Sequence, residues 1–206
     1  MGAPTVCSIL IVNDHIGALQ SSNSSNATYL FQANPNDQYD LGDRSLQCGR
    51  RADAFKFWMM WKRFGTNGLA KKVDTAFKNA NLLKELIKKH SNFELIDDEV
   101  HANCCYRYIP PAFVLKKGEV RTREYDLLLG NVQTIIFQRM TETGKILIQK
   151  QPLIEHKKPS FFRSVMIQDR VRDEDVRNIL IVIEEIGVGI SREDAMKIPS
   201  EEHFFN

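Results

Sequence analysis

The sequence predicts a mixed α/β fold in which helices alternate with strands. The 206 residues are 43% hydrophobic, enough to bury the core of one domain or of two small ones. Residues 69–87 carry apolar side chains at helical spacing, and residues 93–167 alternate between strand-like segments and one long helix. A further helix follows Asp173, which is a suitable N-cap, and ends at Gly187.

The chain opens on a short apolar run, Ser8–Val12, which predicts a β-strand covered on both faces. Such a strand needs neighbours, and no residues before it supply them. The run is too short for a signal peptide or a membrane span, and no basic stretch precedes it. Either a small domain has a central first strand, or residues that belong before Met1 are missing.

A long polar segment follows, from His15 to about Gln47, and predicts a functional or disordered loop. Its middle contains Tyr29 and Phe31 in the stretch "YLF", which a disordered linker would not need. Tyr29 is either an aromatic anchor that packs the loop down or a proton donor carried by a lid. The residue pattern slightly favours the anchor.

The stretch "RADAFKFWMMWKRFG" (51–65) predicts a helix that is buried on most sides, because its large apolar residues surround the axis. Gly65 should end this helix, and Thr66 can cap the next. The next helix has six lysines opposite its apolar stripe: Lys71, Lys72, Lys78, Lys84, Lys88 and Lys89. A nucleic-acid surface would use such lysines, but a solvated helix face is the favoured interpretation.

The predicted elements beyond residue 90 are strands at 93–96 and 103–109, a helix at 124–143, strands at 145–149 and 160–167, and the helix 173–187. The polar tail from Ser191 onward is predicted to be frayed.

Composition excludes several classes of function. The net charge of +2 gives no support for a nucleic-acid or membrane-surface role. The four cysteines, at positions 7, 48, 104 and 105, lack zinc-site spacing, and Cys104 and Cys105 should point to opposite faces of a strand. We therefore expect no metal, free thiols and a cytoplasmic location.

Arg163 is the most informative charged residue. In the strand "SFFRSVMI" it shares a face with Phe161 and Val165, and a guanidinium in apolar surroundings must find an anion. The structural alternative is a nearby Asp or Glu, for example from the last helix. The functional alternative is a ligand carboxylate held by the planar fork. The residue pattern alone favours the structural alternative.

Four segments change this assessment: "YLFQ" (29–32), "YDLGDRSLQCGRRADAFKFWMMWK" (39–62), "YIPP" (108–111) and "SFFRSV" (160–165). Their order and spacing closely resemble the C-terminal half of the animal group II pyridoxal-phosphate-dependent decarboxylases of acidic amino acids. The likeness runs from Met1 to about Ile190. It implies a fold-type I (aspartate aminotransferase-like) enzyme that uses pyridoxal 5'-phosphate and works as a homodimer. Residues 1–57 would be the tail of the large domain, and residues 58–206 the small α/β domain, in which helices pack against a mainly antiparallel sheet.

The resemblance also bears on where the chain begins. "MGAPTVCS" matches the family segment just after the lysine that forms the Schiff base with the cofactor, so this lysine is expected to lie upstream of Met1. The residues that bind the cofactor are expected there too, so the chain by itself should not attach pyridoxal phosphate.

Two functional residues are implied inside the chain. Tyr29 takes the position of the tyrosine that protonates the substrate Cα, on a loop that closes over the partner subunit's active site. Arg163 takes the position of the arginine that binds the substrate carboxylate. Arg107 departs from the family, which usually has tryptophan there, and is expected to affect packing more than chemistry.

Two functions follow as alternatives. The favoured one is a carboxy-lyase that decarboxylates glutamate, aspartate or cysteine sulfinate, of which this chain is a fragment. The other is a catalytically inactive truncated chain that acts only by association with a full-length subunit. No nucleic acid or membrane is expected as a partner.

Overall fold

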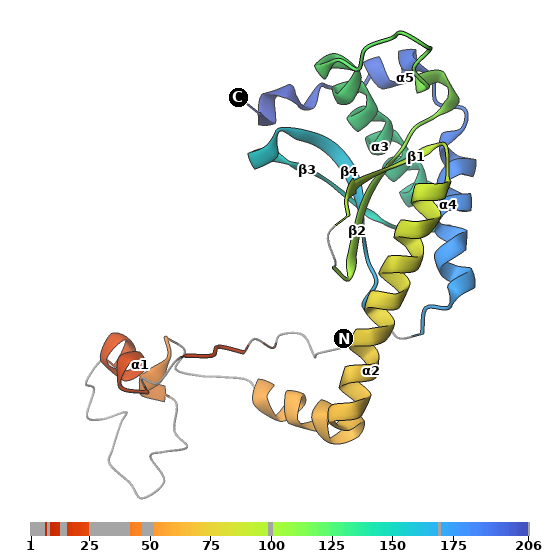
Figure 1. The fold of residues 1–206 in the computed structure, drawn as a ribbon. Helices are drawn as coiled ribbons and strands as arrows, with labels where there is room; N and C mark the ends of the chain where they lie inside the picture. Colours follow the sequence, from red (N-terminus) through yellow and green to blue (C-terminus); the bar gives the residue numbers. More distant parts are fainter. Residues whose placement is uncertain are drawn as a thin grey trace, which may run out of the picture. The chain divides into compact units, whose positions relative to one another are not determined.

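A computed structural model of the protein describes residues 7, 9–12, 16–24, 42–46, 52–98, 101–168 and 170–205 (Figure 1). The chain forms two compact units, Gly2–Asn67 and Gly68–Asn206. This division falls after the predicted boundary at residue 57. The assignment of the two parts to a large and a small domain stays a prediction.

The first unit contains helix α1 (Ile16–Asn23), the 3-10 helix η2 (Gly42–Arg44) and the start of α2 (Asp53–Lys89). The amide of Gln20 donates a hydrogen bond to Asp43, which links α1 to η2. Helix α1 was not predicted, and Tyr29 lies outside the described residues.

The predicted opening strand is wrong. Residues 9–12 form neither strand nor helix, and Ile11 is 87% exposed. An apolar run becomes a strand only when a second strand accepts its hydrogen bonds. All the strands among the described residues belong to the second unit.

Helix α2 is interrupted at Gly65, whose φ of 65° and ψ of 176° are not helical, as the glycine at this position predicted. The predicted burial of the helix before Gly65 is wrong, because Phe55, Trp58 and Trp61 are all exposed. The rings form contacts within the helix instead: Phe55 stacks on Trp58 with ring centroids 5.8 Å apart, and Trp61 lies edge-on to Phe57 with centroids 5.7 Å apart.

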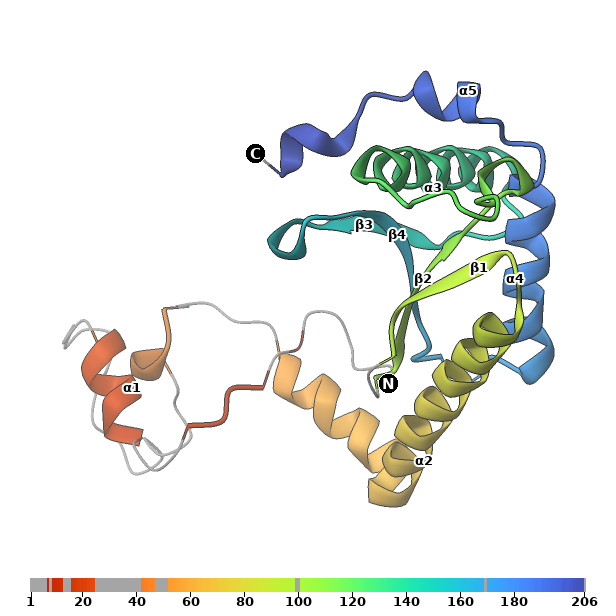
Figure 2. The same ribbon diagram turned by 45° about the horizontal axis from the view of Figure 1, so that its top comes forward.

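The second unit is built on a four-stranded antiparallel sheet with the strand order β1-β2-β4-β3 (Figure 2). The strands are β1 (Phe93–Asp97), β2 (Asn103–Tyr108), β3 (Gln149–Leu153) and β4 (Lys158–Val165). Helices α3 (Arg123–Thr143) and α4 (Asp173–Gly187) cover one face of the sheet. Two short 3-10 helices, η3 (Pro111–Phe113) and η4 (Ile154–His156), lie in the connections. The predicted antiparallel sheet with helices on it is confirmed.

One strand lies later in the sequence than predicted. The apolar run at 146–148 indicated a strand at 145–149, but β3 begins only at Gln149. Pairing with β4 decides its position, since Gln149 lies opposite Arg163 and Leu153 opposite Lys158. Ile148 is buried in the core just before the strand begins.

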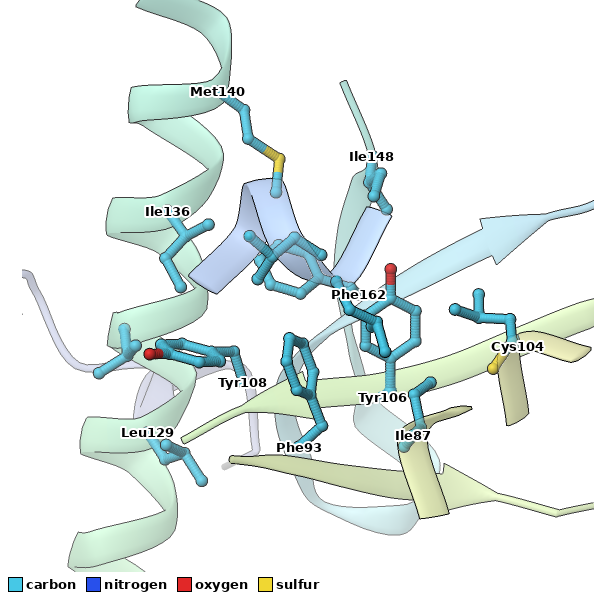
Figure 3. Close-up of a cluster of buried hydrophobic side chains, with 14 of the residues drawn as sticks. Ile87, Phe93, Cys104, Tyr106, Tyr108, Leu129, Ile136, Met140, Ile148 and Phe162 are labelled. Atoms are coloured by element: carbon cyan, nitrogen blue, oxygen red, sulfur yellow. The ribbon is translucent and has the colours of Figure 1, made fainter. Parts of the chain in front are cut away.

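The core lies between the sheet and the helices (Figure 3). Tyr106 and Tyr108 of β2 and Phe162 of β4 are fully buried there, as is Ile136 of α3. Alternate residues of each strand enter this core because side chains alternate across a strand. Cys104 therefore points into the core and Cys105 to the opposite face, as predicted.

The C-terminal tail is ordered, so the prediction of a frayed tail is wrong. Ser191 caps helix α5 (Arg192–Met196), and the 3-10 helix η5 (Glu201–Phe204) follows. The carboxylate of Glu201 is buried and accepts hydrogen bonds from the backbone N–H and the hydroxyl of Ser160. Because both oxygens of this buried carboxylate accept hydrogen bonds, Glu201 attaches the tail to β4.

Two of the lysines on α2 form ion pairs. Lys78 Nζ lies 2.9 Å from Asp173, and Lys88 Nζ lies 2.9 Å from Asp98. These pairs fit the interpretation of a solvated helix face for Lys78 and Lys88, but the prediction is wrong for Lys84, which is buried. In the described part of the chain, no helix is long and apolar enough to cross a membrane.

Candidate functional site

Arg163 stands in the middle of the sheet, on the face away from α3 and α4. It is paired with Cys105 of β2 on one side and with Gln149 of β3 on the other. Antiparallel partners point to the same face, so these three side chains form one row across the sheet. Asp97 of β1, which lies opposite Cys105, continues the row.

The side chain of Arg163 lines two adjoining hollows. The larger, about 440 Å³, has a mixed polar and apolar lining: Ile96, Asp97, His101, Asn103, Cys105, Gln151, Leu153, His156, Lys158, Phe161 and Arg163. The smaller, about 310 Å³, is mostly apolar and is lined by Ile146, Leu147, Ile148, Gln149, Arg163, Ser164, Val165, Met166 and Ile179. Because Arg163 lines both hollows, it can hold an anionic group from either side.

No partner within the described residues satisfies Arg163. Its Nε is buried and makes no hydrogen bond, and no carboxylate of the described chain forms an ion pair with it. Among the described residues, no Asp or Glu of the helix 173–187 pairs with Arg163, and the nearby carboxylate that lines the same hollow is Asp97. A buried guanidinium nitrogen without an acceptor is costly, and an incoming carboxylate would supply the acceptor.

The electrostatics of the larger hollow favour an anion. Lys158 lines it together with Arg163, and Asp97 is its one carboxylate. Burial raises the pKa of the Cys105 thiol, Asp97 raises it further, and Arg163 opposes the rise. The thiol therefore stays neutral near pH 7 and adds no negative charge beside Arg163.

Sequence reasoning identified Arg163 but missed its row neighbours. The period-two rule separated Cys105 from Cys104 correctly, yet it could not pair Cys105 with Arg163. Gln149 and Gln151 gave no signal at all, since the predicted strand ended at residue 149. Among the described residues, no group of three or more His, Cys, Asp or Glu side chains is placed to hold a metal ion.

Comparison with known proteins gives consistent matches. The pyridoxal-dependent decarboxylase conserved domain matches residues 1–109, a range that includes Tyr29. The acidic amino acid decarboxylase GADL1 of Xenopus tropicalis is 42% identical over 184 residues, which are 88% of this chain and 35% of that protein. Cysteine sulfinic acid decarboxylase of Rattus norvegicus is 33% identical over 189 residues, 91% of this chain and 37% of that protein.

The fold comparison agrees. A crystal structure of mouse CSAD superposes with a TM-score of 0.75 at 30% identity, over 86% of this chain and 36% of that chain. The chain thus spans about a third of the length of the relatives it matches. Because the conserved domain matches more than half of the residues, the chain belongs to the pyridoxal-dependent decarboxylase family.

Proposed function

We propose that this chain is the C-terminal part of a pyridoxal-phosphate-dependent decarboxylase of acidic amino acids. In it, Arg163 binds a carboxylate of the substrate. The observation that carries the proposal is the buried Nε of Arg163, which has no acceptor among the described residues. The relatives support the reaction class, since two of them are named as decarboxylases of acidic amino acids or of cysteine sulfinic acid.

The geometry of arginine explains its role. A guanidinium presents parallel N–H donors that match the two oxygens of a carboxylate, so the fork fixes orientation as well as supplying charge. The β-sheet holds the backbone of Arg163 on both sides. A carboxylate bound there would be held in one orientation, which is what selective cleavage of one bond requires.

The residues present fit a substrate-binding role beside the cofactor. Arg163 suits a carboxylate of an amino-acid substrate. None of the described residues is assigned to binding the cofactor. Pyridoxal phosphate, when bound, supplies the electron sink for the pair released as the Cα–carboxylate bond breaks. Cysteine sulfinate, glutamate and aspartate are all amino acids with an acidic side chain, the class of substrate that the names of the relatives give.

Two further parts of the proposal come from the family likeness. Tyr29 would donate the proton that replaces the lost carboxylate at the substrate Cα. The complete enzyme would be a homodimer in which the loop bearing Tyr29 serves the partner subunit's site. Tyr29 lies outside the described residues, so the support for its role is the "YLFQ" sequence and the domain match over residues 1–109.

A chimera tests the proposal. Residues 1–190 of this chain would replace the matching C-terminal segment of mouse CSAD, and decarboxylation would be measured with cysteine sulfinate, aspartate and glutamate. We expect carbon dioxide release with at least one of the three, and loss of release in the Tyr29→Phe chimera. A folded, cofactor-loaded chimera without activity on any of the three would contradict the proposal.

A second candidate is an inactive chain that works by association with a full-length subunit. The exposed rings of Phe55, Trp58 and Trp61 favour it, because a cluster of large apolar side chains on a surface is typical of an interface. Co-expression with a full-length relative distinguishes this candidate. Co-purification of the two chains in equal amounts supports it, whereas separate elution from a size-exclusion column contradicts it.

A further inference from the structure

A second cavity, of about 180 Å³, lies where β1, the start of β4 and the start of α3 meet. Its lining is dominated by charged side chains: Glu94, Arg107, Arg121, Arg123, Asp126, Lys157 and Lys158. We refer to it as the basic cavity. It shares Ile96 and Lys158 with the larger hollow beside Arg163 but contains none of the residues assigned above to the reaction.

The central cation of the basic cavity is Arg107, which is only 3% exposed. Its guanidinium donates to the carbonyl oxygens of Ser160 and Pro159, at 3.2 and 2.6 Å. Its one hydrogen bond to an anion, from Nη1 to Asp126, is long at 3.5 Å. Arginine has five N–H donors, so these three bonds leave it able to donate more.

The carboxylates nearby are already engaged by a different arginine. Arg121 donates to Asp126 at 2.6 and 2.8 Å and to Glu94 at 2.8 Å. Burial lowers the pKa of Arg107, although the carboxylates of Glu94, Asp126 and Glu201 oppose this effect. Arg107 is thus a buried cation that shares its only carboxylate contact with a better-placed arginine.

Three more cations line the cavity, and none of them forms an ion pair with a carboxylate of the lining. Lys157 and Lys158 make no ion pair with any described residue, and Lys158 Nζ only reaches the carbonyl oxygen of Ile96 at 3.5 Å. Arg123 lies 3.6 Å from Glu202. Even when Glu201 and Glu202 are counted with Glu94 and Asp126, the five cations exceed the carboxylates by one.

We propose that the basic cavity binds a phosphate group, either free or as the end of a small phosphoester. Cations from β2, α3 and the start of β4 surround the space, and a tetrahedral dianion accepts hydrogen bonds from several directions at once. A space of about 180 Å³ is large enough for one such group. The binding would offset the excess positive charge around Arg107.

Titration calorimetry on the whole chain tests the proposal. Inorganic phosphate and glycerol 3-phosphate would each be titrated against a sodium chloride blank of equal ionic strength and pH. Saturable binding of one equivalent of either compound supports the proposal. Tighter binding of inorganic phosphate indicates a free anion as the ligand, and tighter binding of the ester indicates a phosphorylated metabolite. Heats no larger than those of the chloride blank overturn the proposal.

Variants locate the binding. Arg107→Gln should raise the dissociation constant about tenfold, as expected for losing one buried charge-assisted hydrogen-bond donor. A double variant, Lys157→Asn with Lys158→Gln, should raise it by a similar factor of about ten, roughly threefold for each exposed charge. Asparagine suits position 157, because the backbone there has a φ of 50°.

The matched control removes two exposed charges elsewhere. Lys145→Gln with Arg172→Gln changes the net charge as much as the double cavity variant does, and these side chains are 57% and 71% exposed. We expect the control to bind within about twofold of wild type, because screening by salt weakens distant charges. Equal weakening by the control, or no weakening by the double cavity variant, would overturn the proposal even if Arg107→Gln does not fold.

Discussion

Cys105 and Arg163 are directly paired across two neighbouring antiparallel strands and point to the same face of the sheet. Burial raises the pKa of the Cys105 thiol, so this neighbour is neutral near pH 7. Gln149, the neighbour on the other side, carries no charge either. The positive charge of Arg163 is therefore flanked by two neutral side chains and is available to a ligand.

The first prediction concerns Arg163→Lys in the chimera with mouse CSAD. We expect kcat/KM to fall about 100-fold or more, because lysine keeps the charge but loses the two-point contact with a carboxylate. The thermal midpoint should stay close to that of the parent, since Arg163 makes no hydrogen bond through its buried Nε. Steady-state kinetics and thermal unfolding check both.

The control for this prediction is Arg172→Lys, which changes an exposed arginine at the N-terminus of α4. It should leave kcat/KM unchanged. If Arg163→Lys kept its activity within a few-fold, or if it lost the fold instead, Arg163 would be a structural residue.

The second prediction concerns stability at high pH. Burial raises the pKa of the Cys104 thiol from 9.0 to about 12. The unfolded chain therefore loses this proton near pH 9, while the folded chain keeps it until about pH 12. Stability is complete below pH 9 and declines between these values, by at most about 1.4 kcal/mol per pH unit for one proton.

Urea unfolding at a series of pH values from 8 to 11 measures this decline. Cys104→Ala should show a shallower decline than wild type, even though its absolute stability is lower because of the cavity it leaves. Part of the decline should remain in the variant, because burial also raises the pKa of Tyr108 to about 12. Identical slopes for the two proteins would refute the assignment.

The third prediction concerns the close approach of α4 to the sheet. A Cβ added at Gly187 would lie 2.5 Å from Cε1 of Tyr108 and 3.0 Å from Cδ1 of Ile136. Both side chains are fully buried and have no room to move. Gly187→Ala should therefore lower the free energy of unfolding by about 1–3 kcal/mol, despite the better helix propensity of alanine.

Gly189→Ala is the matched control, because a Cβ at Gly189 meets nothing within 4 Å. Its stability should lie within about 0.5 kcal/mol of wild type. Chemical denaturation of the two variants compares them directly. Equal stabilities would mean that α4 moves away from Tyr108 at little cost.

The fourth prediction concerns the attachment of the tail. Glu201→Ala removes both acceptors of Ser160, and it leaves the buried N–H of β4 unsatisfied. We expect a loss of about 1–3 kcal/mol in unfolding free energy. The tail should also become susceptible to proteolysis, and limited digestion followed by mass spectrometry would detect this.

Glu193→Ala, at an exposed position in α5, serves as the comparison and should leave digestion and stability nearly unchanged. Cleavage within 191–205 at equal rates in both variants would show that Glu201 does not hold the tail.

The amino-acid sequence by itself determined the elements with strong periodicity and clear end signals. The apolar stripe that includes Leu83 and Ile87 predicted the second part of α2, and Gly65 and Gly144 marked the ends of helices where a left-handed φ is needed. The face that Arg163 shares with Phe161 was also predictable, since alternation along a strand requires no knowledge of its partner. The family likeness was readable from motifs such as "YLFQ" and "SFFRSV".

Tertiary structure decided everything that depends on a partner distant in sequence. The run Ser8–Val12 has the composition of a strand, yet residues 9–12 form no strand, because hydrogen bonds from a neighbour make an apolar run into a strand. The register of β3, the burial of Glu201 and the crowding around Arg107 likewise depend on contacts between residues tens of positions apart. The local sequence determines the backbone conformation that a residue prefers. Only the folded chain determines which charges and hydrogen-bonding groups lie next to that residue.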